Sequence, residues 1–462
     1  MGKTRRMAQK PSLPKGTRDF GPEEMFKRNY IIEKIKGIFQ KYGFMPLETP
    51  AMENLSVLTG KYGDEGDQLL FRLLNSGDFL KKVSEEQFQA GYAKLSPLIA
   101  EKGLKYDLTV PFARYVVMNQ HNLTLPFKRF QIQPVWRADR PQKGRYREFY
   151  QCDADIVGTD SLISEADLLS MIQEVFLNLK LDHYLISLSS RKILEGIAEV
   201  CKAQSQFSAF CVILDKLDKI GKEKVFEELR GIGLSPQSLG LLDDILSLNG
   251  SNDQKLSALN SIFSNSEKGI EGVQEVQQTL LNLKQLGFLT DKVLVDFTLA
   301  RGLSYYTGMI YEVKPTSIKM GTITAGGRYD NLTGVFGLKG LSGVGVSFGI
   351  DRIYDTLEEM NLFPESNPHY TKLLLVSFDD ETLKHALSLL GQLRNVGISA
   401  EVYPDVTKMK KQMGYADKKR IPYVLIVGPE EMEKEKYTLK YMETGKQDLF
   451  TIDQIIENLS RE

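Results

Sequence analysis

Arginine and lysine side chains are concentrated in one short stretch of the sequence, where a phosphate group would meet several donors. The five cations of this stretch are Arg137, Arg140, Lys143, Arg145 and Arg147. The flanking residues are typical of strands, which predicts a hairpin with the cations in its loop. A solvated turn is the ordinary explanation. So many like charges repel one another, however, unless an anion or carboxylates lie nearby, and arginine binds phosphate through two hydrogen bonds.

Two aspartates follow this loop at alternate positions of a predicted strand. Because side chains alternate between the faces of a strand, four residues of 149–157 share one face: Phe149, Gln151, Asp153 and Asp155. The pattern alone favours a half-buried strand with a solvated polar face. Aspartate is depleted in strands, though, and 106–110 repeats the arrangement with Asp107 and Thr109 on one face. Such carboxylates could receive an ammonium group and a ring N–H.

A third cluster, bracketed by two glycines, combines an arginine with an aromatic pair: Arg301, Tyr305 and Tyr306. Taken alone, adjacent tyrosines are more often packing residues than ligands. The glycine pair at 326–327 would let the backbone approach another group closely. It lacks the Gly-Lys-Ser/Thr ending of a P-loop, so by itself it indicates little.

The segment 343–355 predicts a strand that leads into a helix. Its glycine spacing does not fit the dinucleotide-binding fingerprint. Arg352 would fall in the first turn of the helix, where the helix dipole disfavours a cation by about 0.3–1 kcal/mol. The neighbouring Asp351 could offset this cost, and a bound anion would offset it better.

The elements that must position these clusters fall into three kinds. A helix is predicted over 22–42, and strands with few crossover helices between them favour an antiparallel sheet: 129–137, 149–157, 309–314 and 343–349. Residues 195–292 are predicted to be helical. Beyond residue 371, strands and helices alternate, which predicts a separate α/β domain with a parallel sheet.

Composition narrows the class of protein. The 462 residues carry a formal net charge of −1, so a nucleic-acid site must be a local basic patch. Three isolated cysteines favour a reducing compartment, and no histidine pairs with a cysteine at a zinc-like spacing, so no structural metal is expected. No apolar run is long enough to span a membrane, and the start has no secretory pattern. We expect a soluble cytoplasmic protein of two or three domains.

In this order the clusters resemble the three signature motifs of class II aminoacyl-tRNA synthetases, and specifically those of the histidyl-tRNA synthetase family. The motifs correspond to the helix 22–42 with the strand 44–50, to 135–155 and to 343–355. Two further segments resemble motifs peculiar to the histidine-specific enzymes, 300–308 and 325–330, and the opening segment 14–20 matches too. The resemblance spans most of the chain, and the helical insertion is its least specific part.

The resemblance implies the class II synthetase fold, with an α+β catalytic domain built on a mainly antiparallel sheet. This domain would comprise 1–194 and 293–362, interrupted by the helical insertion 195–292 and followed by an α/β anticodon-binding domain at 371–462. The implied activity is that of a ligase. Histidine reacts with ATP to form histidyl-adenylate and pyrophosphate, and is then transferred to the 3′ end of tRNA(His). Mg2+ would accompany ATP, and motif 1 implies a homodimer.

The family's roles, carried over residue by residue, fall on the clusters described above. Arg137 and Arg301 would be catalytic, because they would hold the α-phosphate and stabilise the charge that develops there. For ATP, Phe149 would stack on adenine, Asp139 would lie near its amino group, and Arg352 would reach the γ-phosphate side.

The same resemblance assigns residues to histidine. The α-amino group would be held by Asp107, Thr109 and Gln151. The imidazole nitrogens would be read by Asp155 and Tyr306, with Tyr305 nearby, and Arg301 would also border the amino acid. The glycine pair at 326–327 would form the pocket floor.

For RNA, the sequence offers a basic stretch around a predicted helix: Lys408, Lys410, Lys411, Lys418, Lys419 and Arg420. An ordinary solvated face explains it equally well. Tyr403 and Tyr415 could stack on unpaired anticodon bases, and the loop 140–147 would meet the acceptor end.

Three other kinds of protein would share part of this pattern. A regulatory paralogue would keep the fold without aminoacylation, but such proteins usually lack the C-terminal domain and several motif residues. A synthetase for proline, threonine or glycine would not show the Arg-Gly-x-x-Tyr-Tyr cluster together with Asp155. A general RNA-binding module would need no constellation of Arg137, Arg301 and Arg352.

Overall fold

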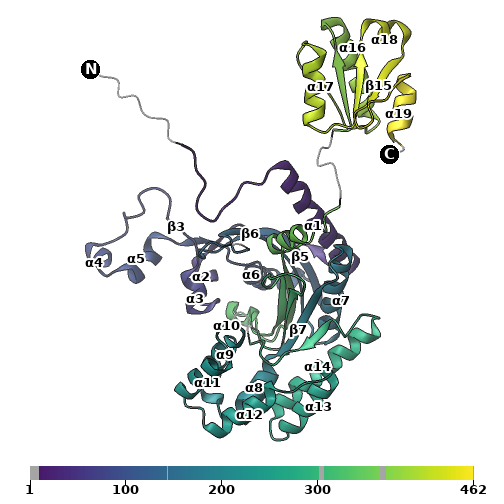
Figure 1. The fold of residues 1–462 in the computed structure, drawn as a ribbon. Helices are drawn as coiled ribbons and strands as arrows, with labels where there is room; N and C mark the ends of the chain where they lie inside the picture. Colours follow the sequence, from purple (N-terminus) through teal and green to yellow (C-terminus); the bar gives the residue numbers. More distant parts are fainter. Residues whose placement is uncertain (1–9, 143, 301–305, 365–370, 461–462) are drawn as a thin grey trace. The chain divides into compact units, whose positions relative to one another are not determined.

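The protein divides into two compact units, Met1–Phe363 and Pro364–Glu462 (Figure 1). The structure is a computed structural model, and it describes residues 10–142, 144–300, 306–364 and 371–460. Each unit has its own sheet.

A large sheet forms the centre of the first unit. Within the described residues it has eight strands in the order β1-β5-β6-β11-β10-β9-β7-β8. Their bounds are Met45–Pro46 (β1), Phe127–Trp136 (β5), Glu148–Val157 (β6), Gly343–Gly349 (β11), Thr324–Tyr329 (β10), Met309–Pro315 (β9), Tyr184–Ser190 (β7) and Val293–Val295 (β8). The interior pairings are antiparallel, and the edge strands β1 and β8 run parallel to their neighbours. The prediction of a mainly antiparallel sheet is confirmed.

Helix α1, Pro22–Lys41, covers this sheet as the apolar spacing of the sequence predicts. Proline stands in its first turn, where its missing N–H costs no hydrogen bond. Ile35 and Phe39 are fully buried, and the Phe39 ring lies 5.6 Å from that of Phe130 and 5.8 Å from that of Phe348. Helices α7, Ile163–Asn178, and α15, Ile350–Glu359, pack beside α1.

The chain between β1 and β5 forms a smaller layer beside the sheet. A three-stranded sheet of the described residues has the order β2-β4-β3, with bounds Met52–Asn54, Lys102–Leu104 and Arg72–Leu73. The helices of this region are α2 Leu55–Leu58, α3 Gly63–Gln68, α4 Glu85–Gln89, α5 Tyr92–Ile99 and α6 Thr109–Asn119. Short 3₁₀ turns lie at Gln120–Asn122 (η1) and Thr333–Phe336 (η3).

The predicted helical segment lies between β7 and β8 (Figure 1). Its described elements are α8 Arg191–Val200, η2 Gln204–Gln206, α9 Phe207–Leu214, α10 Leu217–Ile220, α11 Lys222–Gly231, α12 Pro236–Leu246, α13 Asn252–Ile262 and α14 Glu267–Gln285. Helix α8 starts before residue 195, and α14 packs against both α8 and α7. Buried residues of these helices belong to the same hydrophobic core as the large sheet.

The second unit has a five-stranded sheet within its described residues, in the order β13-β12-β14-β15-β16. The strands are Ala400–Val402 (β13), Leu373–Ser377 (β12), Tyr423–Val427 (β14), Tyr437–Tyr441 (β15) and Gln447–Phe450 (β16), and the helices are α16 Asp380–Asn395, α17 Met409–Lys418, α18 Pro429–Lys434 and α19 Ile452–Ser460. The alternation of strand and helix is confirmed. The expected parallel pairing holds for β12 to β14, whereas β15 and β16 add an antiparallel hairpin.

Among the described helices, none combines the length and the apolar character needed to cross a lipid bilayer.

Candidate functional site

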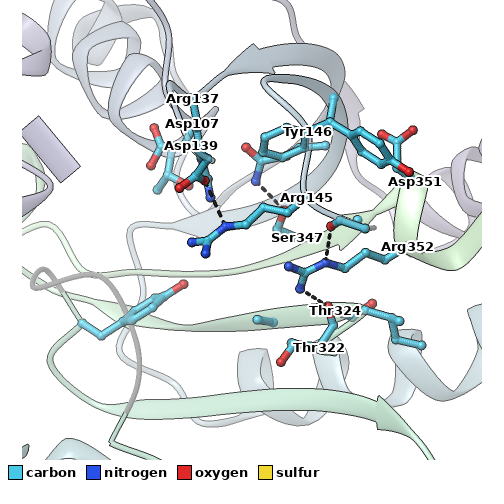
Figure 2. Close-up of a pocket in the computed structure, with 18 residues that line it drawn as sticks. Asp107, Arg137, Asp139, Arg145, Tyr146, Thr322, Thr324, Ser347, Asp351 and Arg352 are labelled. Carbon is cyan, nitrogen blue, oxygen red and sulfur yellow. Dashed lines mark hydrogen bonds and ion pairs between the residues drawn. The ribbon is translucent and has the colours of Figure 1, made fainter. Parts of the chain in front are cut away.

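A cavity of about 300 Å³ lies in the first unit, bounded by the hairpin loop between β5 and β6, by the start of α15 and by β10. Eight of the residues to which the resemblance assigns a role line it: Asp107, Thr109, Arg137, Asp139, Phe149, Gln151, Tyr306 and Arg352. Arg301 and Tyr305 lie outside the described residues. Figure 2 shows the side chains of Arg145 and Arg352 extending into the space of the cavity from the loop and from α15. Residues far apart in the chain therefore meet around one cavity.

A smaller pocket adjoins this cavity. It is lined by Asp153 and Asp155 of β6 and by Tyr329 of β10. Four residues border both spaces: Thr109, Tyr306, Ala325 and Ser347. Because the two pockets share walls, one ligand of moderate size can extend from the larger into the smaller.

Two arginines, Arg137 and Arg352, line the larger cavity. The Arg137 Nε donates to the Tyr106 carbonyl at 3.0 Å, and its guanidinium lies 4.2 Å from the centre of the Tyr106 ring and 5.1 Å from that of Phe149. Arg352 donates from Nε to the Gly144 carbonyl at 2.9 Å and from Nη1 to the Thr322 carbonyl at 2.6 Å. Carbonyl oxygens orient this guanidinium without neutralising its charge.

The charges around Arg352 favour a bound anion. Burial, with the neighbouring charges of Arg145 and Arg137, lowers the pKa of Arg352. A cation whose charged form is disfavoured by burial and by like charges gains most from a bound anion. A phosphate chain beside Arg352 would therefore stabilise the charged form of its guanidinium.

The expectation that Asp351 offsets the charge of Arg352 is wrong. Asp351 Oδ1 accepts a hydrogen bond from Arg28 Nη1 at 2.6 Å and another from Arg18. These partners lie more than 300 residues away in the chain, so the local sequence could not indicate them. The hydrogen bonds of Arg352 run instead to the Gly144 and Thr322 carbonyls.

The opening segment of the chain holds the hairpin loop in place. The Arg18 guanidinium lies 3.3 Å from the centre of the Tyr146 ring, and the Arg147 N–H donates to the Gly16 carbonyl at 2.9 Å. Tyr146 and Asp351 both line the cavity. Sequence reasoning assigned no role to Arg18, Tyr146 or Ser347, because their positions depend on contacts between distant segments.

Buried acceptors also line the cavity. Asp107 Oδ1 accepts from the Val110 N–H at 3.1 Å and from the Tyr62 hydroxyl at 3.0 Å. Gln151 Nε2 donates to Ser347 Oγ at 2.7 Å. Within the described residues, Asp107 Oδ2 and Gln151 Oε1 are buried and receive no hydrogen bond. Buried acceptors are costly when unpaired, and an ammonium group has three N–H bonds with which to pair them.

The strand predicted around Asp107 is wrong. Helix α6 starts at Thr109, and Asp107 precedes it, accepting the N–H of its first turn. An Asp-x-Thr sequence alternates like a strand but also suits a helix start, where a carboxylate meets free N–H groups. Burial raises the pKa of Asp107, while the hydrogen bond from Val110 and the charge of Arg137 oppose the rise.

The solvated polar face predicted for β6 is also wrong. Asp153 and Asp155 are each only 2% exposed, and both line the smaller pocket. Asp155 Oδ1 accepts from the Tyr329 hydroxyl at 2.6 Å, and Oδ2 lies 2.8 Å from Arg129 Nη2. Burial raises the pKa of Asp155, and the Arg129 charge counteracts it. A paired, buried carboxylate at a pocket wall is suited to receive a ring N–H.

Comparisons with known proteins indicate the family of this chain. A family model described as histidyl-tRNA synthetase matches residues 97–353, and one described as an anticodon binding domain matches residues 372–462. A protein from Cytophaga hutchinsonii named histidine–tRNA ligase is 53% identical over 98% of this chain and its whole length. One of the same name from Phocaeicola vulgatus is 52% identical over 97% of this chain and 99% of its own.

The chain belongs to the histidyl-tRNA synthetase family.

A solved histidyl-tRNA synthetase from a Nostoc species shares the fold. It is 30% identical, its TM-score is 0.82, and the match covers 98% of this chain and all of that one. The resemblance of the motifs to this family is thereby confirmed. The regulatory-paralogue alternative loses support, because relatives at about half identity over nearly the full chain are named as ligases.

For a histidyl-tRNA synthetase, the second unit is the part that the anticodon-binding model matches. Lys408, Lys410, Lys411 and Lys418 are exposed. Tyr403, in contrast, is buried in the core, with its ring 5.3 Å from that of Tyr415. The expectation that Tyr403 stacks on an anticodon base is wrong, because its ring is buried against Tyr415 of α17.

Gly345 leaves space for the carboxylate of Asp155 in this synthetase. The two residues face each other across the β6–β11 pairing, and a Cβ on Gly345 would overlap Asp155 Oδ1. We expect Gly345→Ala to raise the KM for histidine at least about tenfold, because Asp155 must then move from the pocket wall. Steady-state kinetics with varied histidine and varied ATP measure this. Gly334→Ala, where a Cβ would make only ordinary van der Waals contact with Lys339, is the control. Equal KM values for wild type and Gly345→Ala would contradict the role given to Asp155.

Proposed function

We propose that the two adjoining pockets are where this histidine–tRNA ligase activates histidine. The ligase activity follows from the family to which the chain belongs. In our assignment the larger cavity receives ATP and the amino-acid backbone, and the smaller pocket receives the imidazole ring. The observation that carries the assignment is the chemistry of the pocket walls, because Arg137, Arg352 and the carboxylate of Asp107 line the larger cavity and the carboxylate of Asp155 lines the pocket that adjoins it.

Positioning and charge stabilisation account for the chemistry. The carboxylate of histidine attacks the α-phosphorus of ATP, the bond from this phosphorus to the bridging oxygen breaks, and pyrophosphate leaves. Arg137 would hold the α-phosphate and stabilise the negative charge that grows there. Arg301 would share this role, as the family's motif implies. Arg352 would hold the outer phosphates, and Phe149 and Asp139 would bind adenine.

Mg2+ would enter with the triphosphate as part of the substrate. Within the described residues, no three side chains of His, Cys, Asp or Glu converge as ligands for a metal ion. We assign the phosphate oxygens to it as ligands and name no protein ligand.

The polar groups of the smaller pocket would select histidine. Asp107, Thr109 and Gln151 would bind the ammonium group, and Asp155 and Tyr306, with Tyr305, would read the ring nitrogens. An apolar side chain in this pocket would leave Asp155 without its ring donor, and sites built on such polar contacts reject analogues that lack them by large factors.

Transfer to tRNA involves the wider molecule. The terminal ribose hydroxyl of tRNA(His) would attack the adenylate, with the loop 140–147 near the acceptor end and the second unit on the anticodon. We assign 1–194 and 293–362 to the catalytic domain, 195–292 to an insertion and 371–462 to anticodon binding.

A homodimer would form through motif 1, where Met45 on the edge strand β1 is 61% exposed. The cytoplasm is the compartment that we assign.

Histidine-dependent exchange of labelled pyrophosphate into ATP tests the proposal. We expect exchange with histidine and background exchange with each of the other amino acids. Circular dichroism and a cooperative thermal transition establish that the sample is folded. Folded protein without exchange above background would refute activation and would favour a paralogue that kept only the fold.

A further inference from the structure

A buried arginine that the proposed mechanism does not use lies beside the smaller pocket. Arg129 of β5 is completely buried, and its guanidinium lies 4.3 Å from the centre of the Phe112 ring. Its Nη2 is 2.8 Å from Asp155 Oδ2 and donates to the Leu108 carbonyl at 3.3 Å. A buried cation is costly unless paired, so these two contacts restrain both partners.

The two contacts connect the two halves of the proposed histidine site. Asp155 is the residue assigned to the imidazole ring. Leu108 stands between Asp107 and Thr109, which are assigned to the α-amino group. One guanidinium thus spans the ring-binding strand and the loop that binds the amino group, although Arg129 lines neither pocket itself.

Stability alone does not account for this arrangement. Within the described residues, Arg129 Nε and Nη1 are buried and find no acceptor. Replacing a buried ion pair with packed apolar residues is often neutral or stabilising, so an incompletely satisfied pair is a poor device for stability.

Arg129 also governs the charge of the pocket. Asp153 and Asp155 lie on the same face of β6, and burial raises the pKa of both, that of Asp153 to about 7. Arg129 lowers both pKa values. The other groups that face the pair are Ser347 of β11, the Tyr329 hydroxyl of β10, the carboxylate of Asp107 before α6, and the buried Lys105 ammonium, whose own pKa burial lowers to about 8. Of the two cations, Arg129 is the one in direct contact with Asp155, so removing Arg129 would favour the protonated forms of the carboxylates.

We propose that Arg129 is a positioning residue for histidine recognition, which keeps Asp155 ionised and aimed at the imidazole ring and holds the amino-group loop at a fixed separation from it. This inference rests on the proposed function of the two pockets. It assigns no contact between Arg129 and the substrate.

The test compares the KM for histidine with the KM for ATP in pyrophosphate exchange, from about pH 7 to about pH 8.5, where free imidazole is mostly neutral. Arg129→Met removes the charge, and Arg129→Lys keeps it on a shorter side chain that lacks the planar guanidinium. Arg328→Met is the matched control, because Arg328 is a buried arginine paired with Glu165 at 2.7 Å and lines neither pocket.

We expect Arg129→Met to raise the KM for histidine at least about tenfold near pH 7, with the KM for ATP within about twofold of wild type. The increase should shrink as pH rises. Without the positive charge of Arg129, the pKa of Asp155 is higher, so its carboxyl becomes negatively charged only at higher pH. Arg129→Lys should raise the KM for histidine at all pH values without this slope, because the charge remains and the alignment is lost.

Other results would overturn the proposal while leaving the proposed function intact. One such result is an active Arg129→Met protein in which the KM for histidine and the KM for ATP rise equally. Another is a KM for histidine in Arg129→Met that has the same pH profile as wild type. A third is the same selective increase in the KM for histidine in Arg328→Met. If Arg129→Met does not fold, Arg129→Lys decides, and a wild-type KM for histidine in that variant would contradict the positioning role. A wild-type protein without histidine-dependent exchange would instead refute the proposed function.

Discussion

Replacement of Arg137 by alanine is expected to lower the maximal rate of histidine-dependent pyrophosphate exchange by about two to three orders of magnitude. The guanidinium is held by the Tyr106 carbonyl and lies near the rings of Tyr106 and Phe149. It is therefore fixed before ATP arrives, and a fixed cation stabilises developing charge without reorganising. Because this charge appears mainly in the transition state, the rate should fall far more than the affinity for histidine changes.

Arg191→Ala is the control for the Arg137 variant. Arg191 also stacks on an aromatic ring, with its guanidinium 4.8 Å from the centre of the Phe207 ring, and it lines neither pocket. Single-turnover measurements of adenylate formation separate the chemical step from binding. Adenylate formation by Arg137→Ala at more than about a tenth of the wild-type rate would contradict the role given to Arg137.

Replacement of Asp155 by alanine is expected to raise the KM for histidine by about two orders of magnitude, equivalent to about 2.8 kcal/mol of binding free energy. The substitution removes the acceptor assigned to the ring N–H, and it leaves Arg129 and the Tyr329 hydroxyl without the carboxylate that they contact. The KM for ATP should change little, since Asp155 lines only the smaller pocket.

Glu165→Ala provides the comparison for Asp155→Ala. It removes the buried carboxylate that pairs with Arg328 at 2.7 Å, outside both pockets. A loss of stability without a selective effect on histidine is expected there. Equal losses of histidine and ATP affinity in Asp155→Ala would show that Asp155 does not read the imidazole ring.

The sequence predicted those parts of the fold and site that depend on local patterns. The alternation of Val344, Val346 and Phe348 indicated a strand, and the spacing after it indicated a helix with Arg352 in its first turn, as the structure has it. The cationic hairpin loop was equally local. These features need only backbone geometry and a buried face, which neighbouring residues determine.

The sequence could not predict contacts between distant segments. Asp351 pairs with Arg18 and Arg28 rather than Arg352, because α1 and the opening segment pack against α15. Arg129 looked like a charged residue of a hairpin strand, and its burial beneath the pocket depends on α6. The local pattern also gave a wrong prediction at Asp107. The residues around it alternate as in a strand, but they lead into helix α6, which starts at Thr109.

A crystal structure with histidine and a non-hydrolysable ATP analogue bound tests the central claim most directly. We expect the imidazole ring to lie in the smaller pocket, with a ring nitrogen at hydrogen-bond distance from Asp155. We expect the α-phosphate to lie beside Arg137 and the outer phosphates beside Arg352. An imidazole bound away from Asp155, or a triphosphate that contacts neither arginine, would contradict it.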